Sequence, residues 1–153
     1  MTIQVEPIGT VRGGRTEVVD DRWGDVKARI EVDGTRFDAQ ALAGLDSFSH
    51  VVVVYYFHRA DPAKIELAAR HPRNNPAWPK IGIFAQRGKN RPNLIGVSTC
   101  RVLGVDGNSL LIQGLDAVDG TPVRDLKPYM KGFEPRHSIR EPAWAAEIMA
   151  NYW

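Results

Sequence analysis

Short runs in which apolar and polar residues alternate, broken by glycine, proline or aspartate, make up most of the chain. Alternation over about four to eight residues indicates a β-strand with one buried face, because successive side chains point to opposite sides. The run 51–57 is instead β-branched and aromatic throughout, so we expect a central strand buried on both faces. The expected strands are 3–11, 26–32, 51–57, 81–86, 97–105 and 109–114.

Turn residues mark the connections between these runs. Asp33-Gly34 and Asp106-Gly107-Asn108 each stand between two strand-like runs, which is typical of β-hairpin turns. Helical signals are fewer, with a short turn expected at 42–48. Asp61-Pro62 offers an N-cap and a first-turn proline for a helix that ends at Pro72.

A further helix is expected at the C-terminus, where Pro142 can occupy the first turn. Trp144, Ile148 and Tyr152 follow at helical spacing and therefore share one face. This aromatic stripe would pack either on the parent domain or on a second subunit. We therefore expect a mainly β (α+β) fold, a single β-barrel-like domain at 1–140 with short peripheral helices and a C-terminal helix at 141–153.

Composition narrows the function only a little. The formal charge of +2 permits a polyanionic partner without requiring one. The single cysteine cannot form an internal disulfide or a cysteine-rich metal site, and no two histidines have the spacing of metal ligands. We expect no metal, and a reducing, cytoplasmic setting. No apolar run is long enough to cross a bilayer, so no membrane partner is expected.

Two densely polar segments, 87–96 and 116–129, flank an apolar hairpin. They hold more arginine, aspartate, asparagine and lysine than a core accepts or a surface turn needs. Arg87 or Arg91 could clamp a carboxylate, and Asp116 or Asp119 could accept hydrogen bonds from hydroxyl or ammonium groups. We therefore expect both segments to face one binding site, although solvated loops and a simple turn at 119–122 are the alternatives.

The same segments carry a family resemblance. Ala85-Gln86-Arg87, Arg91-Pro-Asn-Leu-Ile-Gly-Val-Ser98 and the run from Gly114 through Tyr129 resemble the TsaA-like family, also called YaeB- or VirR-like. The resemblance covers 3–135. The characterised members are S-adenosylmethionine-dependent tRNA N6-methyltransferases with a β-barrel-like fold. The chain departs from the family pattern at Gly88-Lys89-Asn90, at Leu94 and at Arg22-Trp23-Gly24.

The resemblance implies S-adenosylmethionine as cofactor and tRNA as partner, with N6-methylation of threonylcarbamoyladenosine next to the anticodon. No G-x-G-x-x-G turn is present, so a Rossmann-type cofactor site is not expected. The resemblance assigns His58 to the cofactor, although a histidine at a strand end can also serve only as a hydrogen-bonded structural residue. The residues that the resemblance assigns to the cofactor are Arg22, Trp23, Gly24, His58, Arg59, Arg87, Val97, Asp116, Asp119, Gly120 and Thr121.

A nitrogen beside a carbonyl is a poor nucleophile until it loses its proton, so a base or polarising group is expected near the acceptor. We assign Asp125, Lys127 and Tyr129 to this side, with Asp125 or a water accepting the proton. Lys127 or Arg91 would stabilise charge on the carbamoyl oxygen. The candidate tRNA contacts, in or beside predicted loops and expected to surround one mouth, are Arg12, Arg15, Lys89, Arg91, Asn93, Lys127, Lys131 and Arg136.

Three functions remain open on the sequence. The first is the tRNA methyltransferase, expected as a homodimer whose subunits complete each other's sites. The second keeps the cofactor site but changes the substrate to a small molecule or another RNA. The third is a non-enzymatic module that binds adenosylmethionine or a nucleotide.

Overall fold

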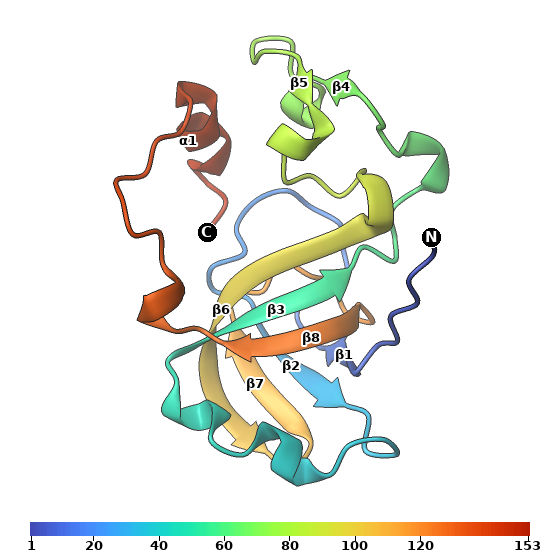
Figure 1. Cartoon of the computed structure of the whole chain (residues 1–153), viewed down its shortest axis with the longest axis vertical. Coiled ribbons are helices and arrows are strands. Elements are labelled where there is room, and N and C mark those ends of the chain that lie inside the picture. The colour runs from blue at the N-terminus through green and yellow to red at the C-terminus, as the bar shows by residue number, and fades with distance from the viewer.

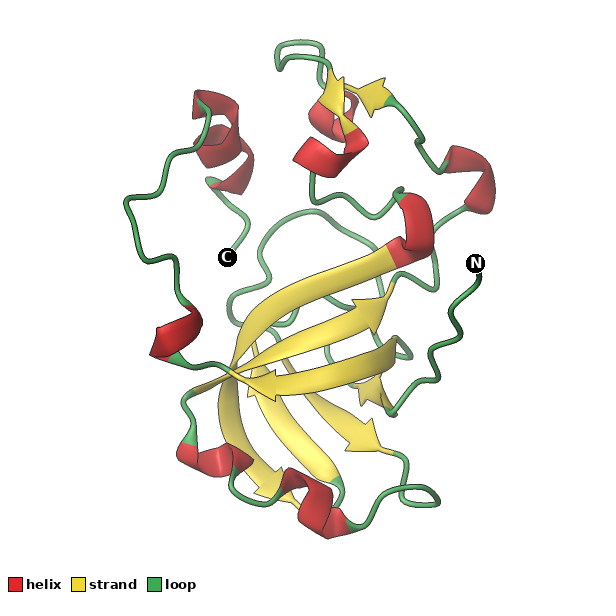
Figure 2. Ribbon diagram, viewed as in Figure 1, coloured by secondary structure: helices red, strands yellow, loops and turns green.

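Six of the chain's strands close into an antiparallel barrel in the order β1-β2-β7-β6-β3-β8 (Figures 1 and 2). The computed structural model describes residues 1–153. The expected β-barrel with short peripheral helices and a C-terminal helix is thus confirmed. The barrel strands are β1 (Gly9–Arg12), β2 (Lys27–Val32), β3 (His50–Tyr56), β6 (Ile95–Asp106), β7 (Ser109–Gln113) and β8 (Pro122–Pro128).

The core fills the interior of this barrel. On β3, Val51, Val53 and Tyr55 are buried, whereas Val52 and Val54 between them are only half-buried. The expectation that this strand is buried on both faces was wrong, because only the inner face of a closed barrel is covered. The fully buried residues that meet β3 inside the barrel include Val11, Ile30, Leu110, Ile112 and Val123.

One of the two expected hairpins is present. β6 and β7 pair directly across Gly107-Asn108, as the sequence indicates. Asp33-Gly34 does not form a hairpin, because β2 pairs with β1 and β7. Instead the Asp33 carboxylate accepts hydrogen bonds from the backbone N–H and the hydroxyl of Thr35, at 2.9 and 2.7 Å. This local turn sends the chain into η1 (Ala39–Leu42) and η2 (Leu45–Ser47), where the short turn was expected.

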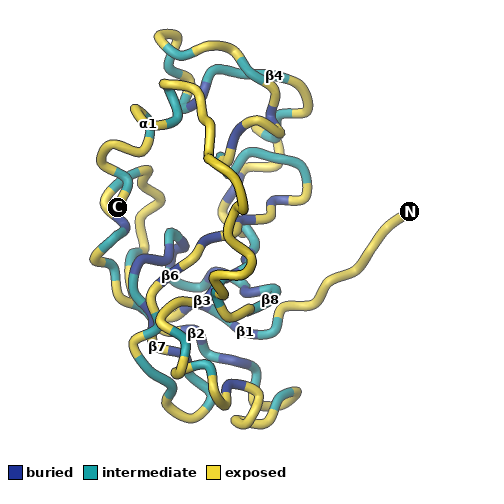
Figure 3. Tube along the Cα trace, turned by 60° about the vertical axis from the view of Figure 1, so that its left-hand side comes forward, coloured by how far each residue is buried: buried dark blue, intermediate teal, exposed yellow.

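Two predicted strands are much shorter in the structure. The first begins only at Gly9, and the tail 1–7 is exposed and extends away from the barrel (Figure 3). The expected strand 81–86 reduces to β5 (Ile81–Gly82), which pairs with β4 (Ala69–Arg70), and continues as η5 (Ile83–Ala85). The Gln86 side chain donates to the carbonyls of Arg70 and Ile81 at 3.0 and 2.9 Å, which fixes this turn.

One barrel strand, β8, lies inside the second polar segment and was not predicted from the sequence. Its alternation is interrupted, since a bulge opposite Val54 and Tyr55 places Arg124 between the paired residues Val123 and Asp125. Val123 is nevertheless buried, and Leu126 packs against the core. The strand therefore forms because barrel closure pairs it with β1 and β3.

The helices are short. The helix expected after Asp61 is only η3 (Pro62–Lys64), although Asp61 caps it as expected by accepting from the Ala63 N–H. The C-terminal helix α1 (Ala143–Met149) lies above the upper end of the barrel in Figure 1, across from β4 and β5. Tyr152 follows three residues after its end. None of the helices is long and apolar enough to cross a membrane. The remaining short helices are η4 (Pro72–Asn74), η6 (Pro92–Leu94) and η7 (Lys131–Phe133).

Candidate functional site

The two polar segments lie on either side of β3. Val54 pairs with Val97 of β6 on one side and with Asp125 of β8 on the other. Since neighbouring strands are about 4.8 Å apart, the Val97 and Asp125 backbones are separated by about 10 Å. Residues paired directly across neighbouring strands point to the same side, and Val54 and Val97 stand between buried neighbours, so the three residues share the outer face of the barrel.

The first polar segment is fixed by its own arginines. Arg87 donates through Nη2 to the Val97 carbonyl at 2.7 Å, which brings two of the predicted cofactor residues together. Arg91 donates through Nη1 to the Gln86 carbonyl at 2.6 Å and so stabilises the loop itself. Asn93 is exposed and has a left-handed backbone at φ 63°. In the same loop the Asn90 Oδ1 atom is buried without a hydrogen-bond partner.

The turn at 119–121 joins the second polar segment to the loop at 13–24. Asp119 accepts through Oδ1 from the Gly13 N–H at 2.8 Å, and its own N–H donates to the Arg15 carbonyl at 2.8 Å. Gly120, with φ 83°, donates to the Val11 carbonyl at 2.8 Å. Thr121 is buried. The turn is therefore bonded on both sides rather than standing free in solvent.

His58 lies beside this turn. A Cβ atom at Gly120 would stand 3.8 Å from His58 Nε2. Burial, followed by the positive charge of Arg59, lowers the pKa of His58 below the ordinary histidine value. Arg59 in turn donates through Nη1 to the Thr16 carbonyl at 2.5 Å. The imidazole is therefore neutral at pH 7, and Arg59 holds the 13–24 loop.

The 13–24 loop is held from within by Arg15. Its guanidinium donates to the carbonyls of Asp21, at 2.6 Å, and Arg22. It also stacks over the Trp23 ring, at 4.7 Å from the ring centroid. Trp23 is buried and Arg22 has a left-handed backbone at φ 64°. Arg15 thus uses donors of both terminal nitrogens within the loop, and the tRNA contact expected of it stays a prediction.

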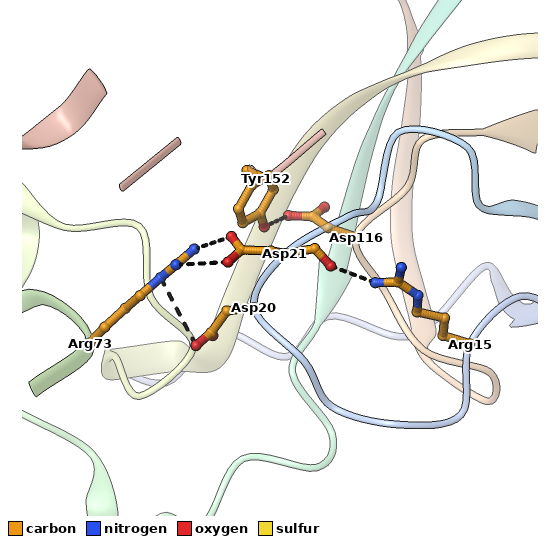
Figure 4. A network of polar contacts seen from close by, with 6 residues as sticks. All are labelled: Arg15, Asp20, Asp21, Arg73, Asp116 and Tyr152. Atoms are coloured by element: carbon orange, nitrogen blue, oxygen red, sulfur yellow. Dashed lines mark hydrogen bonds and ion pairs between the residues drawn. The ribbon is translucent and has the colours of Figure 1, made fainter. Parts of the chain in front are cut away.

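The Asp116 carboxylate gathers three hydroxyl groups, of which Figure 4 shows that of Tyr152. Its Oδ1 atom accepts from the Tyr55 hydroxyl at 2.9 Å and from the Ser98 hydroxyl. The Tyr152 hydroxyl donates to the other oxygen, Oδ2. Burial, and secondly the charge of Asp116, raises the pKa of Tyr55, so this phenol stays neutral and donates.

Sequence reasoning missed several of these partners. Arg73 forms a two-bond ion pair with Asp21, with nitrogen–oxygen distances of 2.8 and 3.2 Å (Figure 4). Its Nε atom also lies 3.9 Å from Asp20. The only sequence signal was a loop rich in proline and asparagine around Arg73, which has a left-handed backbone at φ 51°. Tyr152 was noticed only as a member of the C-terminal aromatic stripe.

Of the three residues predicted for the acceptor side, only Asp125 and Lys127 lie in contact. Lys127 Nζ lies 2.6 Å from Asp125 Oδ2, and both side chains are about half exposed on β8. The Tyr129 hydroxyl instead donates to Glu134 at 2.6 Å, beyond the end of the strand. Its ring meets the edge of His50, with centroids 6.3 Å apart. Asp125 and Lys127 thus form a pair from which the Tyr129 hydroxyl is turned away.

The candidate tRNA contacts do not surround one mouth as expected. Lys89, Arg91 and Asn93 precede β6, whereas Lys131 and Arg136 follow β8. Because the start of β6 and the end of β8 pair with opposite ends of β3, the two groups flank the outer face from its two ends (Figure 1). Arg12 pairs with Glu31 on the barrel wall, at 3.4 Å.

The polar side chains around Asp116 are hydrogen-bonded to one another. No group of three or more His, Cys, Asp or Glu side chains is placed to hold a metal ion. Cys100 is buried, and burial raises its pKa to about 12. Cys100 is therefore a neutral core thiol at physiological pH.

Comparison with known proteins covers most of the chain. The family model for the tRNA-methyltransferase O N-terminal domain matches residues 20–134. The human tRNA (adenine(37)-N6)-methyltransferase is 35% identical over 102 residues, which are 67% of this chain and 23% of that protein. A probable S-adenosyl-L-methionine-binding protein of Methanothermobacter thermautotrophicus is 33% identical over 138 residues, which are 88% of this chain and 95% of that protein.

Solved structures agree with the sequence comparison. A crystal structure of TrmO superposes with a TM-score of 0.75 at 32% identity, covering 92% of this chain and 64% of that one. TrmO from Pseudomonas aeruginosa gives a TM-score of 0.73 at 31% identity, covering 92% and 62% of the two chains. This chain spans less than a quarter of the human relative and just under two thirds of these solved chains. By its family match, its barrel and its likeness to these structures, the chain belongs to the family of the tRNA-methyltransferase O N-terminal domain.

Proposed function

We propose that this chain is an S-adenosylmethionine-dependent methyltransferase that acts on N6 of threonylcarbamoyladenosine next to the tRNA anticodon. The observation that supports this most is the arrangement of the two polar segments, which flank β3 on its two sides and place Arg87 and Val97 on the same outer face of the barrel as Asp125. The same two segments lie within the matched range 20–134. The human relative is named a tRNA (adenine(37)-N6)-methyltransferase.

Arg87 and the 119–121 turn offer groups that suit a ligand with a carboxylate and an ammonium group. Arg87 uses one donor on the Val97 carbonyl and retains others for a carboxylate, since a guanidinium has five. Asp119 accepts from Gly13 through one oxygen only, so the second can accept from an ammonium or a ribose hydroxyl. Gly120 allows close approach of a ligand to its backbone. When bound, the sulfonium of adenosylmethionine supplies the methyl group.

The acceptor side is assigned to the Asp125–Lys127 pair. The acceptor nitrogen must lose its proton on methylation, and Asp125 or a water held by it would take that proton. Lys127, 2.6 Å from Asp125, supplies positive charge for the neighbouring carbamoyl oxygen. Tyr129 is kept in the proposal as a residue that shapes the end of this face through Glu134.

The outer face supports association of two copies. Ile95 and Val97 are exposed by 46% and 41%, and the neighbouring Val52 and Val54 are half-buried. An apolar strip of this kind beside a polar site would be covered in a homodimer whose subunits complete each other's sites. With tRNA as substrate, we expect the protein to be localised in the cytoplasm.

Two assays test the proposed activity. Purified chain is incubated with methyl-labelled adenosylmethionine and tRNA that carries threonylcarbamoyladenosine, and the nucleosides are then separated by mass spectrometry. Nucleosides from a strain lacking this gene and any paralogue give the in vivo counterpart. Label in the methylated nucleoside, and its loss from the deletion strain, are expected. No transfer in vitro and an unchanged nucleoside in the deletion strain would reject the tRNA assignment.

A non-enzymatic role is the second candidate. The Methanothermobacter relative has nearly the same length as the matched region and is named for binding alone. Calorimetric binding of adenosylmethionine without methyl transfer to any nucleic acid would favour this binding module over the enzyme.

A further inference from the structure

The last residues of the chain run alongside the 13–24 loop. The N–H groups of Arg22 and Trp23 donate to the carbonyls of Asn151 and Tyr152, at 2.9 and 2.8 Å. A Cβ atom at Gly24 would lie 2.8 Å from the carbonyl carbon of Trp153, so only glycine permits this approach. Two consecutive backbone hydrogen bonds therefore attach the C-terminus to the loop.

The side chain of Tyr152 reaches in a different direction, to the second polar segment. Its hydroxyl donates to Oδ2 of Asp116 (Figure 4). The other oxygen of Asp116, Oδ1, already accepts from Tyr55 and Ser98. Burial, followed by the charge of Asp116, raises the pKa of Tyr152 and keeps the phenol a neutral donor. One residue thus bonds the loop through its backbone and Asp116 through its side chain.

The surroundings of Tyr152 belong to the candidate cofactor site. Arg73 and Arg87 lie near enough for their positive charges to act on the Tyr152 hydroxyl. Arg73 is the residue that pairs with Asp21 of the loop, and Arg87 bonds the Val97 carbonyl. The phenol therefore stands where the loop, both arginines and the start of the second polar segment meet.

We infer that Tyr152 is a positioning residue, which fixes the 13–24 loop against Asp116 and through them sets the affinity of the chain for adenosylmethionine. This inference rests on the proposed function for the identity of the ligand. It concerns a residue outside the range 20–134 that the family match covers. Tyr152 is not assigned any contact with the ligand itself, because it acts through Asp116 and the loop.

The test uses the full chain with Tyr152→Phe, which removes only the hydroxyl. Tyr56→Phe is the matched control, since the Tyr56 ring packs under Arg124 and is not part of the Asp116 cluster. We expect Tyr152→Phe to weaken adenosylmethionine binding by about tenfold, the effect of one hydrogen bond to a charged acceptor. Amide exchange at Arg22 and Trp23 should accelerate, and kcat at saturating cofactor should stay at the wild-type level.

A double-mutant cycle separates positioning through Asp116 from a general loss of packing. In an Asp116→Asn background, Tyr152→Phe should cause little further loss of affinity, because its acceptor is already neutral. Wild-type affinity in Tyr152→Phe, or losses of affinity that simply multiply in the double variant, would overturn the inference.

If the wild-type chain bound no adenosylmethionine, the proposed function would be wrong. The exchange at Arg22 and Trp23 would then still decide whether Tyr152 fixes the loop, and unchanged exchange would refute that as well.

Discussion

Gly96 of β6 lies directly against Tyr55 of β3, so closely that a Cβ atom at position 96 would come within 2.4 Å of the phenol ring. Because Gly96 has no side chain, the Tyr55 ring can pack against it inside the barrel. From this position the Tyr55 hydroxyl donates to Asp116 at 2.9 Å. A single glycine in the first polar segment thus supports a hydrogen bond made by the second.

Gly96→Ala should therefore destabilise the protein. We expect a loss of about 1–3 kcal/mol in the free energy of unfolding, because Tyr55 cannot move within a packed core without displacing its neighbours. Urea unfolding followed by fluorescence measures it. Gly104→Ala on the same strand is the control, since a Cβ atom there meets nothing within 4 Å. Equal stabilities of the two variants would contradict the packing argument.

The Cys100 thiol should not react with disulfide reagents in the folded protein. Its side chain is buried, and burial, together with the weaker effect of the Asp116 charge, raises the pKa of the thiol to about 12. A disulfide reagent such as DTNB at pH 8 should therefore react only after unfolding in guanidinium, when one thiol per chain becomes available. Rapid reaction of the native protein would show that this end of the core opens readily.

His58 should titrate below the ordinary histidine value of about 6.5. Because burial and Arg59 lower its pKa in the folded state, the unfolded chain binds more protons as the pH falls through the ordinary value. His58 therefore makes the folded protein less stable at acid pH, and this part of the pH dependence should disappear in His58→Gln. NMR titration of the imidazole Cε1–H gives the midpoint directly. A midpoint at or above 6.5 would show that the ring is not desolvated.

The barrel could be predicted from sequence because strand alternation is a local signal. It is clear in β2 and β7, where an apolar residue at every second position faces the core, and in β6 buried and exposed positions also alternate, although its buried positions include Gly96 and Ser98. β8 could not be predicted because a bulge and three charged residues interrupt its alternation of apolar and polar positions. It is defined only by its pairing with β1 and β3. Long-range closure, rather than local preference, decides such a strand.

The polar cluster at Asp116 shows a second limit. Its donors come from positions 55, 98 and 152, which no spacing rule connects to 116. The family resemblance identified Asp116 and Arg87 but assigned both to the ligand, whereas the structure gives each of them protein partners as well. Residue types at a site can be read from a motif, but the partners of each residue depend on the fold.

The Asp125–Lys127 pair should matter for turnover and not for stability. Both side chains are about half exposed, and exposed ion pairs contribute about 0–1 kcal/mol. Lys127→Ala and Asp125→Asn should therefore unfold like the wild type and bind adenosylmethionine normally, while kcat for methyl transfer falls at least about tenfold. Arg29→Ala is a suitable control, because Arg29 and Glu31 form the same type of pair along β2, at 2.8 Å. Full activity in both β8 variants would move the proton acceptor elsewhere.

Arg73 should be hard to replace even by lysine. Its guanidinium makes two hydrogen bonds to Asp21, at 2.8 and 3.2 Å, and its side chain is only 25% exposed. Lysine keeps the charge but cannot reproduce this planar two-bond contact, so Arg73→Lys should free the 13–24 loop. We expect faster amide exchange across that loop and a loss of about 1 kcal/mol in unfolding free energy. Lys64→Ala, which breaks the long exposed contact to Asp61 at 4.0 Å, should change neither quantity.

Arg73 and Tyr152 both hold the 13–24 loop, so Arg73→Lys and Tyr152→Phe should have non-additive effects on amide exchange in the double variant. Strictly additive effects would mean that the two contacts fix separate parts of the loop.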